Sequence, residues 1–99
     1  MVKSADILNF LKNNKQRFES EYNLSQIGLF GSLARGEQNQ GSDIDIIVEF
    51  RPDTEELHEL KARLRKEIQD EFDRPVDICR LKYIKPVFRD SISKEAKYV

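Results

Sequence analysis

Apolar residues recur at helical spacing in three segments of the chain. Residues 4–22 and residues 52–72 each place apolar side chains every three or four positions, which predicts two helices, the second beginning near Pro52. Pro86 is expected to open a final short helix. The apolar positions expected to be buried on these helices are Ile7, Leu8, Leu11, Phe18, Tyr22, Leu57, Leu60, Leu64, Ile68, Phe72, Val87, Phe88, Ile92 and Ala96.

The ends of these helices carry their own signals. Ser4 is the expected N-cap of the first helix, because its hydroxyl can accept a hydrogen bond from a free backbone N–H group. Asn14 and Lys15 interrupt the apolar face of the same helix. The Asp-Arg-Pro sequence at 73–75 is expected to end the long helix.

Three other segments follow the pattern of strands. Residues 26–32 (QIGLFGS) form an apolar run that ends in Gly-Ser, which predicts a buried strand entering a tight turn. Residues 43–50 alternate between two faces, and residues 76–81 (VDICRL) predict a third strand. Between the first two strands, residues 33–38 favour one or two helical turns and residues 39–42 a loop.

The predicted order is therefore helix, strand, short helix, strand, long helix, strand and helix. This order is typical of an α+β or α/β layer in which helices pack on a small sheet. The 99 residues suit one small domain with one modest core, and we expect residues 1–99 to form that domain.

Charge and composition exclude several classes of protein. The chain has 17 basic and 18 acidic residues, so it has no overall bias toward nucleic acid or an anionic membrane, and we do not expect direct nucleic-acid binding. Its one cysteine, Cys79, excludes an internal disulfide and a cysteine-rich zinc site. The longest aliphatic run has three residues, and the first ten residues lack a signal-peptide segment. We expect a soluble cytoplasmic protein.

The strand at 43–50 carries two acids where strands disfavour them. Its alternation places Ile44, Ile46, Val48 and Phe50 on one face and Asp43, Asp45, Ile47 and Glu49 on the other. Two carboxylates about 5 Å apart repel by about 3 kcal/mol at an effective dielectric constant near 20, so Asp43 and Asp45 suggest a cation. Oxygen ligands favour Mg²⁺, and two ions about 3.5–4 Å apart are the arrangement used in phosphoryl transfer.

Two further segments can complete such a site. Asp77 shares one face of the third strand with Cys79, and it would join the two acids as a ligand or as a general base if the strands are neighbours. Gly31 and Ser32 end the first strand where a helix is expected to begin, which is a place for an anion such as phosphate. Arg35 lies one helical turn beyond Ser32 and could contact the same phosphate.

Each of these features also has a purely structural interpretation. The Asp-x-Asp pair could keep an edge strand soluble, and Ser32 could be a simple N-cap. Arg35 could form an ion pair with Glu37 or Asp43. Cys79 is expected to be a small core residue, the single His58 to be exposed, and the basic run at 61–66 to be a solvated helix face.

Residues 31–48 (GSLARGEQNQGSDIDIIV) resemble the signature of the polymerase-β-type nucleotidyltransferase superfamily. Gly-Ser is followed after ten residues by Asp-x-Asp, and residues 75–79 (PVDIC) match the strand that carries the third acid of that signature. With the small size of the chain, these motifs are similar to the minimal nucleotidyltransferase (MNT) group. The resemblance extends from the strand at Ile27 to the last residues of the chain.

The resemblance implies a fold, an activity and a site. The fold would be a small mixed β-sheet with helices packed on it, and the reaction would move AMP from ATP to a hydroxyl group with release of pyrophosphate. By position, Asp43, Asp45 and Asp77 would be the catalytic residues and the ligands of two Mg²⁺ ions. The nucleotide would be bound by Gly31, Ser32, Arg35 and Ser42.

The resemblance also implies a partner. Free-standing MNT proteins are typically encoded beside a helical HEPN-domain protein, often a ribonuclease toxin, and act as antitoxins that attach AMP to a tyrosine of that toxin. Two alternatives stay open: a non-catalytic antitoxin that neutralises a HEPN partner by occlusion, and a subunit that needs a separate substrate-binding chain. The sequence also leaves a homo-oligomer open.

Overall fold

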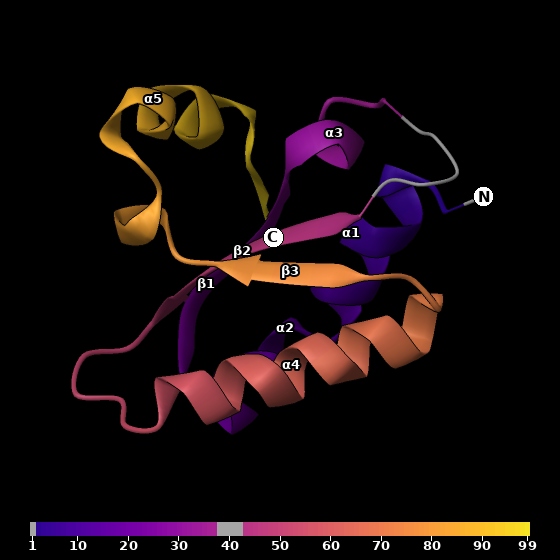
Figure 1. Cartoon of the computed structure of the whole chain (residues 1–99). Helices are drawn as coiled ribbons and strands as arrows, with labels where there is room; N and C mark the ends of the chain where they lie inside the picture. Colours follow the sequence, from indigo (N-terminus) through magenta and orange to yellow (C-terminus); the bar gives the residue numbers. More distant parts are fainter. Residues whose placement is uncertain (1, 38–42) are drawn as a thin grey trace.

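Four strands form one mixed sheet in the computed structural model, which describes residues 2–37 and 43–99 (Figure 1). The order of the strands is β3-β2-β1-β4. The central strands β1 (Leu24–Phe30) and β2 (Ile44–Phe50) are antiparallel, β3 (Val76–Cys79) runs parallel to β2, and β4 (Lys97–Tyr98) runs antiparallel to β1. The predicted α+β class with a small mixed sheet is confirmed.

Helices lie on both sides of this sheet. The helices α1 (Ser4–Asn13), α2 (Lys15–Glu21) and α4 (Leu57–Phe72) cover one face, where the main core lies. The single-turn helix α3 (Gly31–Ala34) and the helix α5 (Pro86–Glu95) lie beside each other on the opposite side (Figure 1). Within the described residues, no helix has the length and the apolar content needed to cross a membrane.

The alternation along β2 is the one that the sequence predicted. Its first apolar set, Ile44, Ile46, Val48 and Phe50, is buried in the main core with α1, α2 and α4. On the other face Asp45 and Glu49 are partly exposed, whereas Ile47 is fully buried. The face that carries the acids therefore also carries one buried apolar side chain, Ile47.

The N-terminal helix is divided in two, whereas one helix was expected over residues 4–22. Asn14 leaves the helical conformation with φ −106° and ψ 7°, and its Nδ2 donates to the carbonyl of Phe10 at 2.9 Å. Asparagine competes for backbone hydrogen bonds in this way, which ends α1. Ser4 is the first helical residue and not the N-cap. Lys3 takes that position, and its backbone N–H donates to the Asp6 carboxylate at 3.1 Å.

The long helix begins later than predicted. Pro52 lies in a turn, and α4 starts only at Leu57. Asp53 and Glu56 have φ values of 64° and 58°, which a right-handed helix cannot contain. The third strand ends at Cys79, earlier than expected, because residues 81–83 form a 3₁₀ turn, η1 (Leu81–Tyr83).

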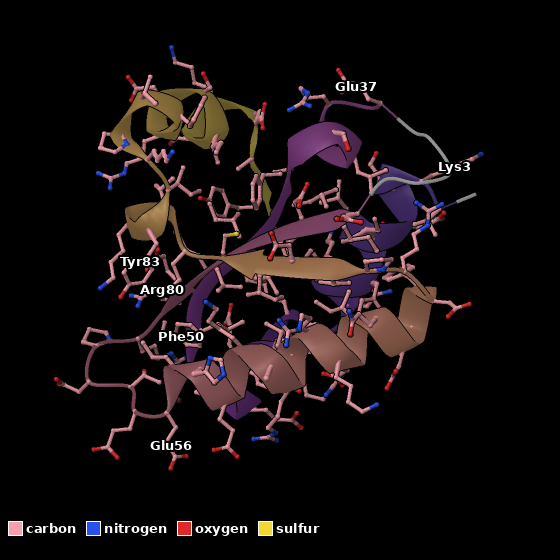
Figure 2. All side chains as sticks on the ribbon, in the orientation of Figure 1. Lys3, Glu37, Phe50, Glu56, Arg80 and Tyr83 are labelled. Carbon is pink, nitrogen blue, oxygen red and sulfur yellow. The ribbon has the colours of Figure 1, made fainter. Side chains whose placement is uncertain are left out.

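Arg80 attaches this turn to the sheet. Its guanidinium lies 5.6 Å from the ring of Phe50 and 5.4 Å from the ring of Tyr83 (Figure 2). Its Nη2 donates to Glu49 at 3.4 Å. The chain is thereby directed from β3 toward α5.

The last helix begins at Pro86 as predicted, but its expected burial was wrong. Val87 is 76% exposed and Phe88 is 54% exposed, while Ile92 and Ala96 are only partly buried. Helical spacing shows which side chains share a face, but not whether another element covers that face. Most of the surface of Val87 and about half of that of Phe88 therefore stay uncovered by the described part of the chain.

The strand β4 was not predicted, and Gly28 makes room for it. A Cβ atom at Gly28 would lie 2.7 Å from the carbonyl oxygen of Lys97, so only glycine lets the two backbones approach this closely. The Val99 N–H group donates to the carbonyl of Ile27 at 3.1 Å. This pairing brings the residues that follow α5 alongside the last residues of β1.

Candidate active site

Asp45 and Asp77 are directly opposite each other on neighbouring parallel strands. The register of β2 and β3 pairs these two residues, so their side chains leave the same face of the sheet from backbones about 4.8 Å apart. Asp43 is exposed and immediately precedes β2, two residues before Asp45. The structure thus brings Asp77 to the Asp-x-Asp segment, as the sequence hypothesis required.

The environment of Asp45 disfavours its negative charge. Burial, and then the nearby carboxylates of Asp77 and Asp43, raise the pKa of Asp45 to about 6, and the positive charge of Arg35 offsets part of this rise. A divalent cation between the acids would relieve both effects, and carboxylate oxygens fit Mg²⁺. Within residues 2–37 and 43–99, however, no three metal-ligating side chains are already gathered, so Asp43 would have to turn toward the pair as a cation binds.

The Gly-Ser turn packs against these acids. Gly31 follows Phe30, the residue that pairs with Asp45 across β1 and β2, and it has a φ of +77°. A Cβ atom at Gly31 would lie 3.0 Å from Cγ of Asp45, so a side chain here would collide with the carboxyl group. The two motifs that were separated in sequence form one continuous site.

The remaining sequence-predicted residues lie around this turn. Ser32 is the second residue of α3 and is partly buried, and its carbonyl accepts hydrogen bonds from the N–H groups of Arg35 and Glu37 at 3.1 and 2.9 Å. Arg35 is exposed at the end of α3. Ser42, expected to bind the nucleotide, lies outside the described residues.

Glu95 is the site residue that sequence reasoning missed. Arg35 was expected to pair with Glu37 or Asp43, and it does pair with Glu37, at 3.1 Å. Its second partner is Glu95, whose two oxygens lie 3.2 and 3.1 Å from Nη1 of Arg35. The same carboxylate accepts the backbone N–H of Gly31 at 3.3 Å. No motif marks this residue, which lies just before the unpredicted strand β4.

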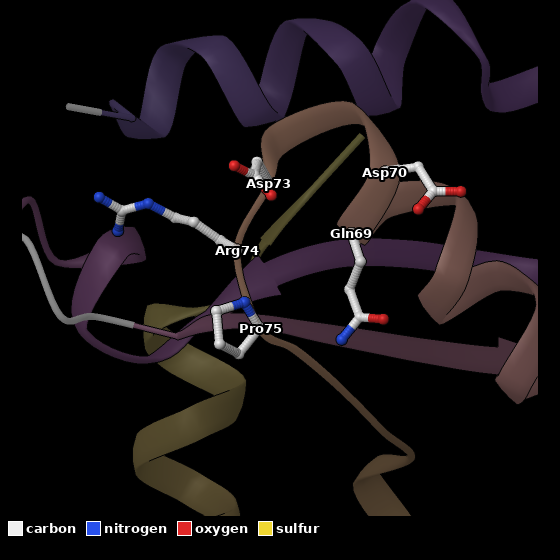
Figure 3. A pocket seen from close by; sticks show the side chains of 5 residues that line it. All are labelled: Gln69, Asp70, Asp73, Arg74 and Pro75. Carbon is white, nitrogen blue, oxygen red and sulfur yellow. The ribbon is translucent and has the colours of Figure 1, made fainter.

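A cavity of about 310 Å³ opens beside the turn. The cavity is lined by the end of β1, by the turn that follows it and by one side of α5. The lining residues are Phe30, Gly31, Arg35, Phe88, Ser91, Ile92 and Glu95. A hollow of about 350 Å³ lies elsewhere, where α4 turns toward β3 (Figure 3). That hollow contains none of the predicted site residues; it is lined by Gln69, Asp70, Asp73, Arg74 and Pro75.

Cys79 lies beside Asp77, and His58 lines a cavity of about 180 Å³ together with Asp77. Burial, and then the charges of Asp77 and Asp45, raise the pKa of the Cys79 thiol, and its Sγ lies 3.9 Å from an oxygen of Asp77. Cys79 is therefore a neutral thiol at neutral pH and not an activated nucleophile. His58 is exposed on α4, as expected.

The sequence of the chain matches a known protein family. Residues 8–99, which include β1, the Gly-Ser turn and all three acids, match the family described as nucleotidyltransferase domain. The chain belongs to the nucleotidyltransferase domain family. It is therefore a nucleotidyltransferase.

Individual relatives of this nucleotidyltransferase agree with the assignment. A candidate protein adenylyltransferase of Methanocaldococcus jannaschii is 37% identical over 100 residues, with 96% of each chain covered. A solved structure described as a candidate minimal nucleotidyltransferase has a TM-score of 0.76 at 24% identity, covering 97% of this chain and 95% of that chain. A solved complex of a tri-AMPylated Shewanella oneidensis HEPN toxin with an MNT antitoxin has a TM-score of 0.59 at 21% identity, covering 91% of this chain and 69% of that chain. The two structural likenesses show the fold.

Proposed function

We propose that this nucleotidyltransferase transfers AMP from ATP to a hydroxyl group of a protein. The observation that carries the proposal is the packing of the Gly31 turn against Asp45, with Asp77 opposite. This geometry offers a place for phosphate and a place for cations at the same point. The name of the M. jannaschii relative supports AMP as the transferred group and a protein as the acceptor.

The reaction divides the work among a few residues. The acceptor oxygen attacks the α-phosphorus of ATP, the bond from that phosphorus to the bridging oxygen breaks, and pyrophosphate leaves. Asp77 accepts the proton of the hydroxyl group as it attacks. Gly31, Ser32, Arg35 and Ser42 hold the phosphates. Two Mg²⁺ ions, held by Asp43, Asp45 and Asp77, would neutralise the triphosphate when bound.

The proposed acceptor is a tyrosine of a HEPN-domain toxin, and the proposed role of this chain is that of its antitoxin. The solved complex of an MNT antitoxin with a tri-AMPylated HEPN toxin supports this partner. The surface of α5 also suits a partner, since the side chains of Val87 and Phe88 are 76% and 54% exposed and Phe88 lines the cavity beside the turn. An apolar group of this kind is typical of a protein-binding surface.

The same exposed side chains favour one alternative. A chain that binds its partner through α5 could neutralise a toxin by covering it, with no transfer of AMP. The two functions differ in one respect that can be measured: only the enzyme moves the α-phosphate of ATP to the partner.

Isotope labelling tests the proposed function. This chain is incubated with Mg²⁺, a HEPN-domain protein encoded beside its gene, and ATP labelled either in the α- or in the γ-phosphate. We expect the partner to acquire label from α-labelled ATP alone, on a tyrosine. Label from the γ-phosphate would show phosphoryl transfer instead. A stable complex without any label would favour occlusion.

A further inference from the structure

Glu95 fills the position that the proposed function gives to a phosphate group. Its Oε1 accepts the N–H of Gly31 at 3.3 Å, and both of its oxygens lie within 3.2 Å of Nη1 of Arg35. A backbone N–H and a guanidinium are the donors that proteins use for phosphate oxygens. The chain has therefore placed one of its own anions on the donors that an incoming nucleotide needs.

The fold holds Glu95 in this place. Glu95 is the last residue of α5, and the next residues form β4, which pairs with β1 at Gly28 and Leu29. This pairing ends only two residues before Gly31. Glu95 therefore reaches the Gly-Ser turn because β4 reaches the end of β1.

A nucleotide and Glu95 cannot use these donors together. The N–H of Gly31 is a single donor, so a phosphate oxygen that accepts it must displace the Glu95 carboxylate. The charge of Glu95 also acts on the acids, since it is among the groups that raise the pKa of Asp45. A triphosphate entering beside Glu95 would meet this additional negative charge.

Displacement of Glu95 needs little rearrangement. The helix that carries it has no buried side chain among the described residues. A change of side-chain rotamer, or a small movement of α5, would free Gly31 and Arg35 without disturbing the main core.

We infer that Glu95 is an internal competitor of the nucleotide, a carboxylate that lowers ATP affinity by occupying the phosphate position of the free enzyme. The inference rests on the proposed function, because it takes the ligand of this turn to be a triphosphate. If Glu95 occupies the phosphate position in about nine of ten molecules, only about one in ten is free to bind ATP. The apparent dissociation constant is then about tenfold higher than that of the open site. Removing the carboxylate should therefore strengthen binding.

Two matched variants test this role. Glu95→Gln removes one charged partner of Arg35 and the anion on Gly31, whereas Glu37→Gln removes the other partner of Arg35 and leaves Gly31 untouched. Titration calorimetry with Mg²⁺–ATP and with inorganic tripolyphosphate gives the dissociation constants. We expect Glu95→Gln to bind both ligands about tenfold more tightly than the wild type, and Glu37→Gln to stay within about twofold. Glu95→Ala, which also removes the acceptor oxygen, should bind at least as tightly as Glu95→Gln.

The outcomes separate this inference from the proposed function. Equal or weaker binding by both Glu95 variants, with thermal unfolding that shows a folded protein, would overturn the inference and make Glu95 a positioning residue for Arg35. Tighter binding in variants that transfer no AMP to any partner would uphold the competitor and overturn the proposed function. If neither ligand binds to the wild type or to a folded variant, both are wrong.

Discussion

Gly31 packs directly against the carboxyl group of Asp45, and this contact joins the Gly-Ser turn to the acids. The contact depends on two properties of Gly31, its φ of +77° and its lack of a Cβ atom. Gly36 shares the first property, with a φ of +78°, but a Cβ atom there would meet nothing within 4 Å. A side chain at Gly36 would therefore cause backbone strain alone, whereas a side chain at Gly31 would cause the same strain and also collide with Asp45.

We predict that Gly31→Ala abolishes nucleotide binding and that Gly36→Ala preserves it. Each variant should lose about 1–2 kcal/mol of stability from the left-handed conformation alone. Gly31→Ala should lose more, because its methyl group collides with Asp45. Urea unfolding and ATP titration of both variants measure the two effects. Equal losses of stability and equal affinities in the two variants would contradict the contact.

The raised pKa of Asp45 predicts a pH dependence of stability in metal-free buffer. The pKa of Asp45 is about 6 in the folded state against an ordinary value of 3.8, so the folded state binds more protons between these pH values. Stability therefore falls as pH rises from about 4 to 6, by about 1 kcal/mol once the shift is discounted for solvent screening. Asp45→Asn should remove this fall and be more stable at pH 7. Urea unfolding across this range, with EDTA present, tests the sign; a parallel profile in the variant would refute it.

Mg²⁺ and ATP together should stabilise the protein by mass action. At a hundred times the dissociation constant the gain is about 2.7 kcal/mol, which raises the melting temperature of a domain of this size by roughly 10 °C. EDTA should reverse the shift. The double variant Asp43→Asn, Asp45→Asn should show none of it and should still unfold cooperatively. An equal shift in the double variant would show that these acids hold no cation that the nucleotide needs.

The pairing of β4 with β1 should depend on the absence of a side chain at Gly28. Gly28→Ala places a Cβ atom against the Lys97 carbonyl, and backbone cannot move aside as a flexible side chain can. We expect faster hydrogen exchange at the Val99 amide, which is bonded to Ile27 in the wild type. Exchange in α4, at Leu64 for example, should stay slow. Unchanged protection of Val99 would show that the strand accommodates the methyl group.

The sequence predicted those parts of the site that depend on local pattern. Asp43, Asp45 and Gly31 follow from alternation and from a turn signal within one short segment. Asp77 required the further assumption that its strand is next to β2, which the register confirms. Glu95 could not be found in this way, because it lies 60 residues from Arg35 and reaches it through a two-residue strand that has no pattern of its own.

The errors in the fold also have physical causes. Asn14 ends a helix by bonding its side chain to the backbone, and left-handed residues at Asp53 and Glu56 delay α4, although the apolar spacing suggests continuous helices. The exposure of Val87 and Phe88 was missed because spacing does not reveal whether a helix is covered. The helix ends therefore depend on the conformation of single residues, and the exposure of α5 depends on packing between distant segments.

Intact-mass spectrometry of the proposed HEPN-domain partner tests the central claim most directly. The HEPN-domain protein is incubated with Mg²⁺, ATP and either the wild-type chain or the double variant Asp43→Asn, Asp45→Asn. We predict a mass increase of one or more AMP units with the wild type and no increase with the variant. An equal increase with the variant would contradict the role of these acids. No increase with either chain, despite a stable complex, would contradict the transfer of AMP to this partner.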